Sequence, residues 1–143
     1  MTQTTDVALL PEFVRFLETG EVAPGAFAAD VLFDMNVPSW RYQIQGHEAA
    51  SNLFHSEKPA GVRVGSVIPT ATGFVAESDY DTVEGGAAIY YRSVSLVTVQ
   101  DGQISKVVHY CTGPWDEATR TRQAREAPML RPDLWVTRPT FNA

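Results

Sequence analysis

Two turn signals in the second half of the chain limit its fold more than any other feature of the sequence. Gly85-Gly86 and Asp101-Gly102 are dipeptides that favour two-residue loops between antiparallel strands. The segments around them are rich in β-branched and aromatic residues and are bounded by turn residues, as strands are. Together they predict a long antiparallel meander. Its strands are expected over 62–69, 74–83, 87–99 and 103–112.

Helical patterns flank this meander. Apolar residues recur at helical spacing over 7–19, where Thr5 or Asp6 is the expected N-cap and Gly20 the expected end. Helices that precede an antiparallel meander are typical of an α+β fold with the helices gathered on one face of the sheet. The remaining elements are expected as helices over 24–29, 47–57 and 115–127, a strand that begins at Val31 and ends before Pro38, and, after a turn, a second short extended piece within 39–46.

Length and composition favour one globular domain. The chain has 143 residues, 44% of them hydrophobic and 20% charged, which is close to the average of globular proteins. We expect a single domain over 1–127 and an irregular, proline-containing tail over 128–143. The sequence shows neither a signal peptide nor an apolar run of membrane-spanning length, so we expect a cytoplasmic protein with no membrane partner.

Charge and residue counts argue against several kinds of partner. The chain has 17 acidic and 11 basic side chains, a formal net charge of −6, whereas nucleic-acid binding depends on clustered Lys and Arg. Nucleic acid is therefore not an expected partner. One cysteine cannot form an internal disulfide, and the three histidines show none of the spacings of metal ligands. We expect no metal site.

The two turn signals also set a strand register. If each dipeptide is a two-residue loop, Asp79 lies opposite Arg92 and His109 lies opposite Val94. Because side chains alternate across a sheet, a polar group on three neighbouring strands then shares one face. The members of this group are Glu77, Asp79, Tyr90, Arg92, His109 and Cys111.

The face that carries this polar group also carries Val75, Val94, Leu96 and Val107. Polar groups that converge within an apolar concavity are what a small-molecule pocket requires, so we expect this face to line a pocket. A one-residue slip in the glycine turn would bring Ser78 and Tyr80 to the pocket instead. The opposite face is too apolar for plain exposure and predicts a homodimer interface there. Its apolar and aromatic members are Tyr91, Val97, Val99, Val108 and Tyr110.

His109 is the first candidate for a catalytic residue. A histidine titrates near neutral pH and can act as a general base or acid within hydrogen-bond reach of a substrate. A neighbouring carboxylate, Glu77 or Asp79, would fix its tautomer and raise its pKa. The alternative is a partly buried structural histidine at the edge of the sheet.

Asp34 and Asn36 follow a buried-looking strand, VLFDMN. Asp34 is a candidate second acid or base, and Asn36 is a candidate to orient substrate or water. The alternative is ordinary turn chemistry before Pro38, where Asp and Asn are favoured. Trp40 and Tyr42 are candidates to line the mouth of the pocket, although aromatic side chains also pack simply as core.

Three further residues are candidates for contact with a substrate. Arg92 could hold a substrate carboxylate or pair with Asp79, and the pair is the favoured interpretation. Cys111 would be a nucleophile only if His109 activated it, and a free cysteine more often behaves as a small buried apolar residue. Trp115 is a further candidate for the pocket mouth.

Two stretches of the chain resemble the nuclear transport factor 2-like superfamily, and within it SnoaL-like proteins. They are FAADVLFDMNVPSWRYQIQGHEAASNLF and the final hairpin SVSLVTVQDGQISKVVHYCTGPWD, and the likeness covers about residues 7–116. The resemblance implies a cone-shaped, curved antiparallel sheet that wraps around helices and encloses an apolar pocket, a cystatin-like α+β barrel that is usually dimeric. Similar proteins include polyketide cyclases, limonene epoxide hydrolase, ketosteroid isomerase and scytalone dehydratase, which mostly use acid/base chemistry without a cofactor.

The resemblance also bears on single positions. In the cyclases and epoxide hydrolases an aspartate lies on the last strand, seven residues after the hairpin glycine, and counting from Gly102 reaches His109. The epoxide hydrolases also need an Asp-Arg-Asp arrangement, and Asp79, Arg92 and His109 do not map onto it one to one. Val37 occupies the position of the isomerase base, which makes steroid isomerase chemistry unexpected.

These observations lead to one main hypothesis and two alternatives. The main hypothesis is a cofactor-independent enzyme on a small, largely apolar metabolite, in which His109 moves a proton with Asp79 or Glu77 orienting it and Asp34 and Asn36 assisting. Cyclisation, isomerisation, dehydration and ring-opening hydration all fit. The first alternative is a non-catalytic binding or accessory protein that uses the same pocket. The second is an oxygenase-type small subunit, which would need a larger partner chain.

Overall fold

The expected meander is the centre of the molecule. The computed structural model describes residues 7–53, 61–132 and 134. Its strands form one seven-stranded sheet in the order β2-β1-β6-β5-β4-β3, with β7 beside β5. The strands are β1 (Phe27–Val37), β2 (Trp40–Gln45), β3 (Gly61–Thr70), β4 (Gly73–Glu84), β5 (Ala87–Gln100), β6 (Gln103–Cys111) and β7 (Trp115–Asp116). The helices are α2 (Leu10–Thr19), α3 (His47–Ser51) and α4 (Glu117–Glu126).

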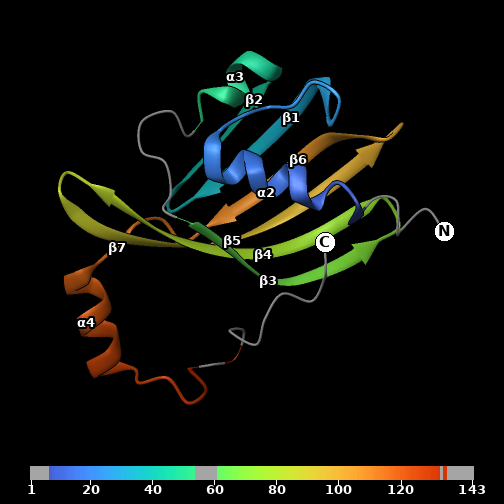
Figure 1. The fold of residues 1–143 in the computed structure, drawn as a ribbon. Coiled ribbons are helices and arrows are strands. Elements are labelled where there is room, and N and C mark those ends of the chain that lie inside the picture. The colour runs from blue at the N-terminus through green and yellow to red at the C-terminus, as the bar shows by residue number, and fades with distance from the viewer. Residues whose placement is uncertain (1–6, 54–60, 133, 135–143) are drawn as a thin grey trace.

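The predicted α+β class is confirmed, with two differences in the sheet. Strands β1 and β6 run parallel, so the sheet is mixed rather than wholly antiparallel. The sheet is also open, because β2 and β3 form its two edges and do not pair with each other. Figure 1 shows a curved sheet with α2 lying across its concave face and α4 standing away from that face.

Helix α2 supplies much of the core. Its apolar stripe is buried against phenylalanines of the sheet, and the Phe16 ring lies 5.0 Å from that of Phe33 between centroids. Burying one such side chain stabilises a fold by roughly 1.5–3 kcal/mol. The helix ends where expected, at Gly20, whose φ of 78° is easily reached by glycine and whose N–H donates to the Phe16 carbonyl at 2.7 Å.

Three predicted helices have different limits. Residues 24–26 form a turn instead of a helix, and β1 begins at Phe27 because its backbone pairs with β6 around Ile104. The predicted helix over 47–57 is α3 in its first part, and 54–57 lie outside the described residues. The predicted helix over 115–127 is α4, preceded by β7. Most of the expected tail lies outside the described residues.

The two hairpins differ in how well their register was predicted. In the β4–β5 hairpin Asp79 pairs with Arg92, as predicted. The β5–β6 hairpin begins as predicted at its loop, but a β-bulge at Ser105 shifts the register, so Thr98 pairs with Lys106. A one-residue shift moves every later side chain to the other face. His109 therefore lies opposite Ser95, and the prediction that it lies opposite Val94 is wrong.

The bulge places the β6 residues after Ser105 on the opposite face to the one predicted relative to β5, and the inward face of β5 is also the one that was predicted to face outward. We call the face covered by α2 the inner face, defined by Phe74, Ala76, Val97 and Val107, which are all buried. The other side is the outer face, defined by Glu77, Arg92, Val94 and Leu96. The predicted interface residues Tyr91, Val97 and Val99 lie on the inner face, which corrects their assignment, whereas Val108 and Tyr110 lie on the outer face.

Gly73 generates a prediction about stability. It begins β4 so close to β5 that an added Cβ atom would lie 1.9 Å from the Val97 carbonyl oxygen. We expect Gly73→Ala to lower the free energy of unfolding by about 3 kcal/mol or more, because backbone atoms on both strands must move. Gly61→Ala is the control, since a Cβ atom there meets nothing within 4 Å. Similar urea midpoints for both variants would contradict the expectation.

Candidate active site

A cavity of about 430 Å³ opens on the inner face of the sheet. This volume lies within the range of small-molecule sites. Its wall combines apolar side chains of β1 with polar and aromatic side chains of β4, β5 and β6. The lining residues are Met35, Val37, Tyr42, Leu53, Tyr80, Thr82, Glu84, Tyr91, His109 and Cys111.

His109 is buried in the wall of this cavity. Its side chain is 5% exposed, and its Nδ1 atom lies 2.8 Å from the hydroxyl oxygen of Ser95, which is fully buried. Burial lowers the pKa of His109 to about 4, so the imidazole is neutral at pH 7. The expected carboxylate neighbour and raised pKa are wrong. What the structure provides is a neutral ring whose orientation Ser95 fixes through one nitrogen.

The other end of the cavity is aromatic and acidic. The Tyr91 hydroxyl donates a hydrogen bond to Glu84 Oε2 at 2.5 Å. The Tyr91 ring stacks on that of Tyr80, with centroids 5.0 Å apart. Burial raises the pKa of both phenols, so both are protonated at neutral pH and act as hydrogen-bond donors.

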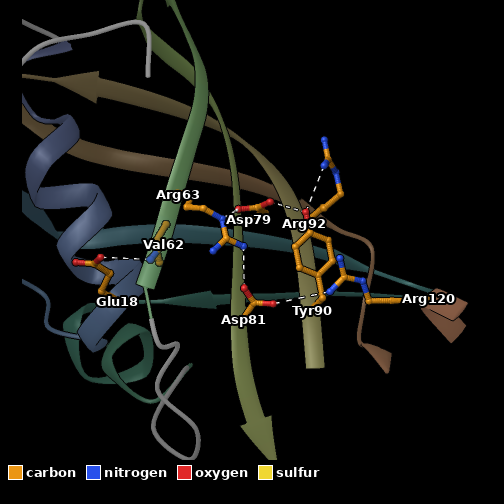
Figure 2. Close-up of polar contacts among 8 residues, drawn as sticks. All are labelled: Glu18, Val62, Arg63, Asp79, Asp81, Tyr90, Arg92 and Arg120. Carbon is orange, nitrogen blue, oxygen red and sulfur yellow. Dashed lines mark hydrogen bonds and ion pairs between the residues drawn. The ribbon is translucent and has the colours of Figure 1, made fainter. Parts of the chain in front are cut away.

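The predicted partner of His109, Asp79, lies on the outer face. Figure 2 shows it in a network of arginines, where it accepts hydrogen bonds from Arg63 Nε at 2.7 Å and from the Tyr90 hydroxyl. Arg92 donates to the same Tyr90 hydroxyl at 3.3 Å, so it reaches Asp79 through Tyr90 rather than directly. The predicted pairing of His109 with Asp79 or Glu77 is therefore wrong, because the sheet separates them.

Helix α4 is attached to this outer network. Arg120 places its guanidinium 4.3 Å from the centre of the Tyr90 ring and 4.0 Å from Asp81. Asp81 also accepts from Arg63 at 2.9 Å, and Trp115 packs on Tyr90. The expected substrate contacts Tyr90, Arg92 and Trp115 thus form part of the outer-face packing and do not line the cavity.

Asp34 and Asn36 also lie on the outer face. Asp34 forms a two-point ion pair with Arg41, at 2.9 Å and 2.6 Å, and the hydrogen bond from Arg41 lowers the pKa of Asp34. Asn36 donates to the backbone carbonyls of Asp34 and His109 at 3.4 Å. The structure gives both residues contacts between neighbouring strands, and neither faces the cavity.

Three other residues were predicted to contact a substrate, and only two of them line the cavity. Tyr42 and Cys111 line the cavity, as expected. The Cys111 sulfur accepts a hydrogen bond from the Gly113 N–H, and the partner of the His109 ring nitrogen is Ser95 rather than Cys111. Trp40 is 68% exposed on the edge strand β2 and is not among the lining residues.

The sequence interpretation missed Ser95, Tyr91 and Glu84 as residues of the site. The sequence of β6 does not distinguish the two registers, because Ile104 alternates with Val108 in one of them and matches Val107 in the other only if there is a bulge. In the structure Ile104 and Val107 are both buried, three residues apart, an interval that requires the extra residue between them.

Comparison with known proteins tests the resemblance. No family model matches the chain, and no curated protein matches it. Among solved structures, an NTF-2 like protein of unknown function from Burkholderia xenovorans LB400 is 18% identical, with a TM-score of 0.57 over 84% of this chain and 92% of that chain. A protein from Catenulispora acidiphila DSM 44928 with a ketosteroid isomerase-like fold is 13% identical, with a TM-score of 0.60 over 73% and 85%. The chain has the NTF2-like fold.

A further similar structure is that of an LEH-like epoxide hydrolase of M. tuberculosis. It is 15% identical to this chain, with a TM-score of 0.59 over 76% of this chain and 83% of that chain. The fold predicted from the resemblance is therefore confirmed, and the narrower likeness to SnoaL-like proteins stays a prediction. One fold hosts many chemistries, so the activity has to be argued from the cavity itself.

The described part of the chain was also examined for metal-binding groups and for membrane-spanning helices. Within residues 7–53, 61–132 and 134, no three His, Cys, Asp or Glu side chains are grouped so that they could hold a metal ion. None of the helices in those ranges has the length and apolar character needed to cross a membrane. The expected cytoplasmic location stays a prediction.

The buried imidazole predicts how stability depends on pH. The pKa of His109 is about 4 in the folded chain, against an ordinary value of 6.5. Between these values the unfolded chain binds a proton that the folded chain does not. We therefore expect the free energy of unfolding to fall by about 3 kcal/mol as pH falls from 6.5 to 4. His109→Gln should lose this part of the pH dependence.

The measurement is urea unfolding of each variant across this pH range. Ser95→Ala is the control, because it removes the hydrogen-bond partner but leaves the imidazole buried, and it should keep the wild-type slope. Parallel curves for the wild type and His109→Gln would show that His109 is not the group responsible.

Proposed function

We propose that the chain is a cofactor-independent enzyme that transfers a proton on a small, largely apolar metabolite, with His109 as the proton-transferring group. The observation that supports this most is the neutral, buried imidazole held by Ser95 in the wall of a 430 Å³ cavity. A general base must be unprotonated, oriented and within reach of a bound ligand, and His109 meets the first two conditions before any ligand arrives.

The tautomer of His109 determines its chemistry. When Nδ1–H donates to the Ser95 hydroxyl, Nε2 keeps its lone pair and can accept a proton from a carbon acid or from a water molecule. The imidazolium that forms is strongly acidic in this buried place, so it returns the proton to a second position of the ligand. The protonated phenols of Tyr42 and Tyr80 line the same cavity and would donate hydrogen bonds to an oxygen that gains negative charge.

This sequence of two proton transfers conserves atoms and charge. It is common to isomerisation, cyclisation, dehydration and ring-opening hydration, which differ in the ligand rather than in the base. The apolar residues Met35, Val37 and Leu53 in the cavity wall favour a ligand with an apolar body.

One observation favours the non-catalytic alternative. A pKa near 4 makes His109 a weak base, and a neutral imidazole fixed by Ser95 is equally suited to hydrogen-bonding a ligand that leaves unchanged. The same cavity would then serve a binding or accessory protein. If the chain is an enzyme of this kind, replacing the His109 ring lowers its kcat. If it is a binding protein, the wild-type chain has no turnover.

The turnover experiment separates these functions. Small soluble metabolites are screened against the wild-type chain by ligand-observed NMR, and those that bind are tested for turnover. We expect His109→Gln to lower kcat by about 100-fold or more while Kd changes little, because the amide can hydrogen-bond but cannot shuttle the proton.

Glu77→Gln is the matched control for the turnover experiment. The Glu77 carboxylate lies on the outer face, so the variant should have the same kcat as the wild type. Full activity of His109→Gln would refute the proton-transfer role. Binding without turnover in the wild type would support the binding protein instead.

We also propose that two copies of the chain associate through the outer face. An apolar row crosses four neighbouring strands there, because Ile68 pairs with Val75, Val75 with Leu96, and Leu96 with Val108. Ile68 and Leu96 are 58% and 42% exposed. On the same face Glu77 lies in the next row and Arg92 in the row after it, opposite charges that a two-fold axis can bring together. Such a surface is typical of a subunit interface.

Leu96→Glu tests this dimer. A charge in the middle of the apolar row should convert a dimer into a monomer in sedimentation equilibrium. Val83→Glu is the control, because Val83 is 59% exposed and lies eight residues further along β4 from Val75. A wild-type chain that is monomeric at every concentration, or a Leu96→Glu variant that stays dimeric, would exclude the interface.

A further inference from the structure

The charge of the cavity wall is negative. Glu84 is the acidic residue of the wall, and no Lys or Arg is among the described residues that line the cavity. The imidazole of His109 is neutral at pH 7, so it does not balance the carboxylate. A carboxylate with no counter-ion in the same cavity favours a positively charged ligand.

Three aromatic rings line the same cavity as this carboxylate. Tyr42, Tyr80 and Tyr91 line the same cavity, and the stacking of Tyr80 on Tyr91 holds both rings in place. The faces of aromatic rings attract organic cations by about 0.5–2 kcal/mol each, more when the site excludes water. Tyr91 uses one of several acceptor positions of the Glu84 carboxylate, and an ammonium group can bind at another.

The cavity has two chemically different ends. Tyr91 lies four residues from Ser95 on β5, which separates the acidic end from the His109 end by about 13 Å of strand. Met35, Val37 and Leu53 provide apolar surface in the same wall. The cavity therefore suits an elongated ligand with a polar head, an apolar body and a far end that reaches His109.

We infer that this cavity selects an amphipathic organic cation, an amine whose ammonium group binds Glu84 among the tyrosines and whose apolar body extends toward His109. The inference rests on the proposed function, because it names the class of ligand for the same cavity. An anionic ligand with the same body would be repelled by Glu84, and a neutral one would lose the attraction of the carboxylate and rings.

Three probes with one body test the charge preference. They are 4-phenylbutylamine, 4-phenylbutanol and 4-phenylbutyrate, which carry a cationic, a neutral and an anionic head at neutral pH. In calorimetric titration of the wild-type chain we expect the amine to bind about tenfold more tightly than the alcohol, and the carboxylate more weakly than the alcohol.

Three variants test whether the preference for the amine over the alcohol arises from Glu84 and Tyr91 in the cavity. Glu84→Gln keeps an acceptor for the Tyr91 hydroxyl and should bring the amine and the alcohol to the same Kd. Tyr91→Phe should reduce the preference, because the phenol no longer anchors Glu84. Glu77→Gln removes the same charge from the outer face and should leave all three constants unchanged. A loss of preference in Glu77→Gln equal to that in Glu84→Gln would overturn the inference.

The outcomes also separate this inference from the proposed function. If the alcohol binds the wild-type chain as tightly as the amine, the cation preference is wrong, but the cavity is still a ligand site and the proposed function stands. If none of the probes binds, the inferred ligand class is wrong, and the proposed function then depends on the kcat of His109→Gln alone.

Discussion

The β-bulge at Ser105 is the constraint on which the candidate site depends. Without that extra residue the β5–β6 hairpin would continue in the register of its loop, and His109 would face the arginine network of the outer face. With it, the ring turns inward, hydrogen-bonds Ser95 and joins the cavity wall. One unpaired backbone position thus decides whether the imidazole is buried and neutral or faces outward.

The bulge also explains why the sheet has two different polar systems. On the outer face Asp79, Arg63 and Tyr90 satisfy one another, and these contacts hold the Asp79 carboxylate in one position. On the inner face His109 has a hydroxyl partner that carries no charge. The proposed proton transfer places its chemistry on the inner face, where the imidazole is buried and neutral at pH 7.

The elements could be predicted from the sequence more reliably than the site. Gly20, Gly85-Gly86 and Asp101-Gly102 mark chain reversals through local backbone preferences, and each lies at the end of the element expected. The bulge depends on how β6 fits between β5 and β1, so it is set by packing over long sequence separations. The helix expected over 24–29 is missing for the same reason, because pairing of Phe27 with β6 outweighs local helical preference.

The inner face buries serine hydroxyls that lower the stability of the sheet. Ser93 is 8% exposed and its hydroxyl has no hydrogen-bond partner among the described residues, which costs roughly 1–3 kcal/mol. Ser78 and Ser95 are also buried beside it on β4 and β5, where valine would pack better. A sequence selected only for folding would not place a row of buried hydroxyls next to a buried imidazole. Ser93 pairs with Cys111 and Ser95 pairs with His109, so the row of hydroxyls adjoins two residues of the cavity wall on the inner face.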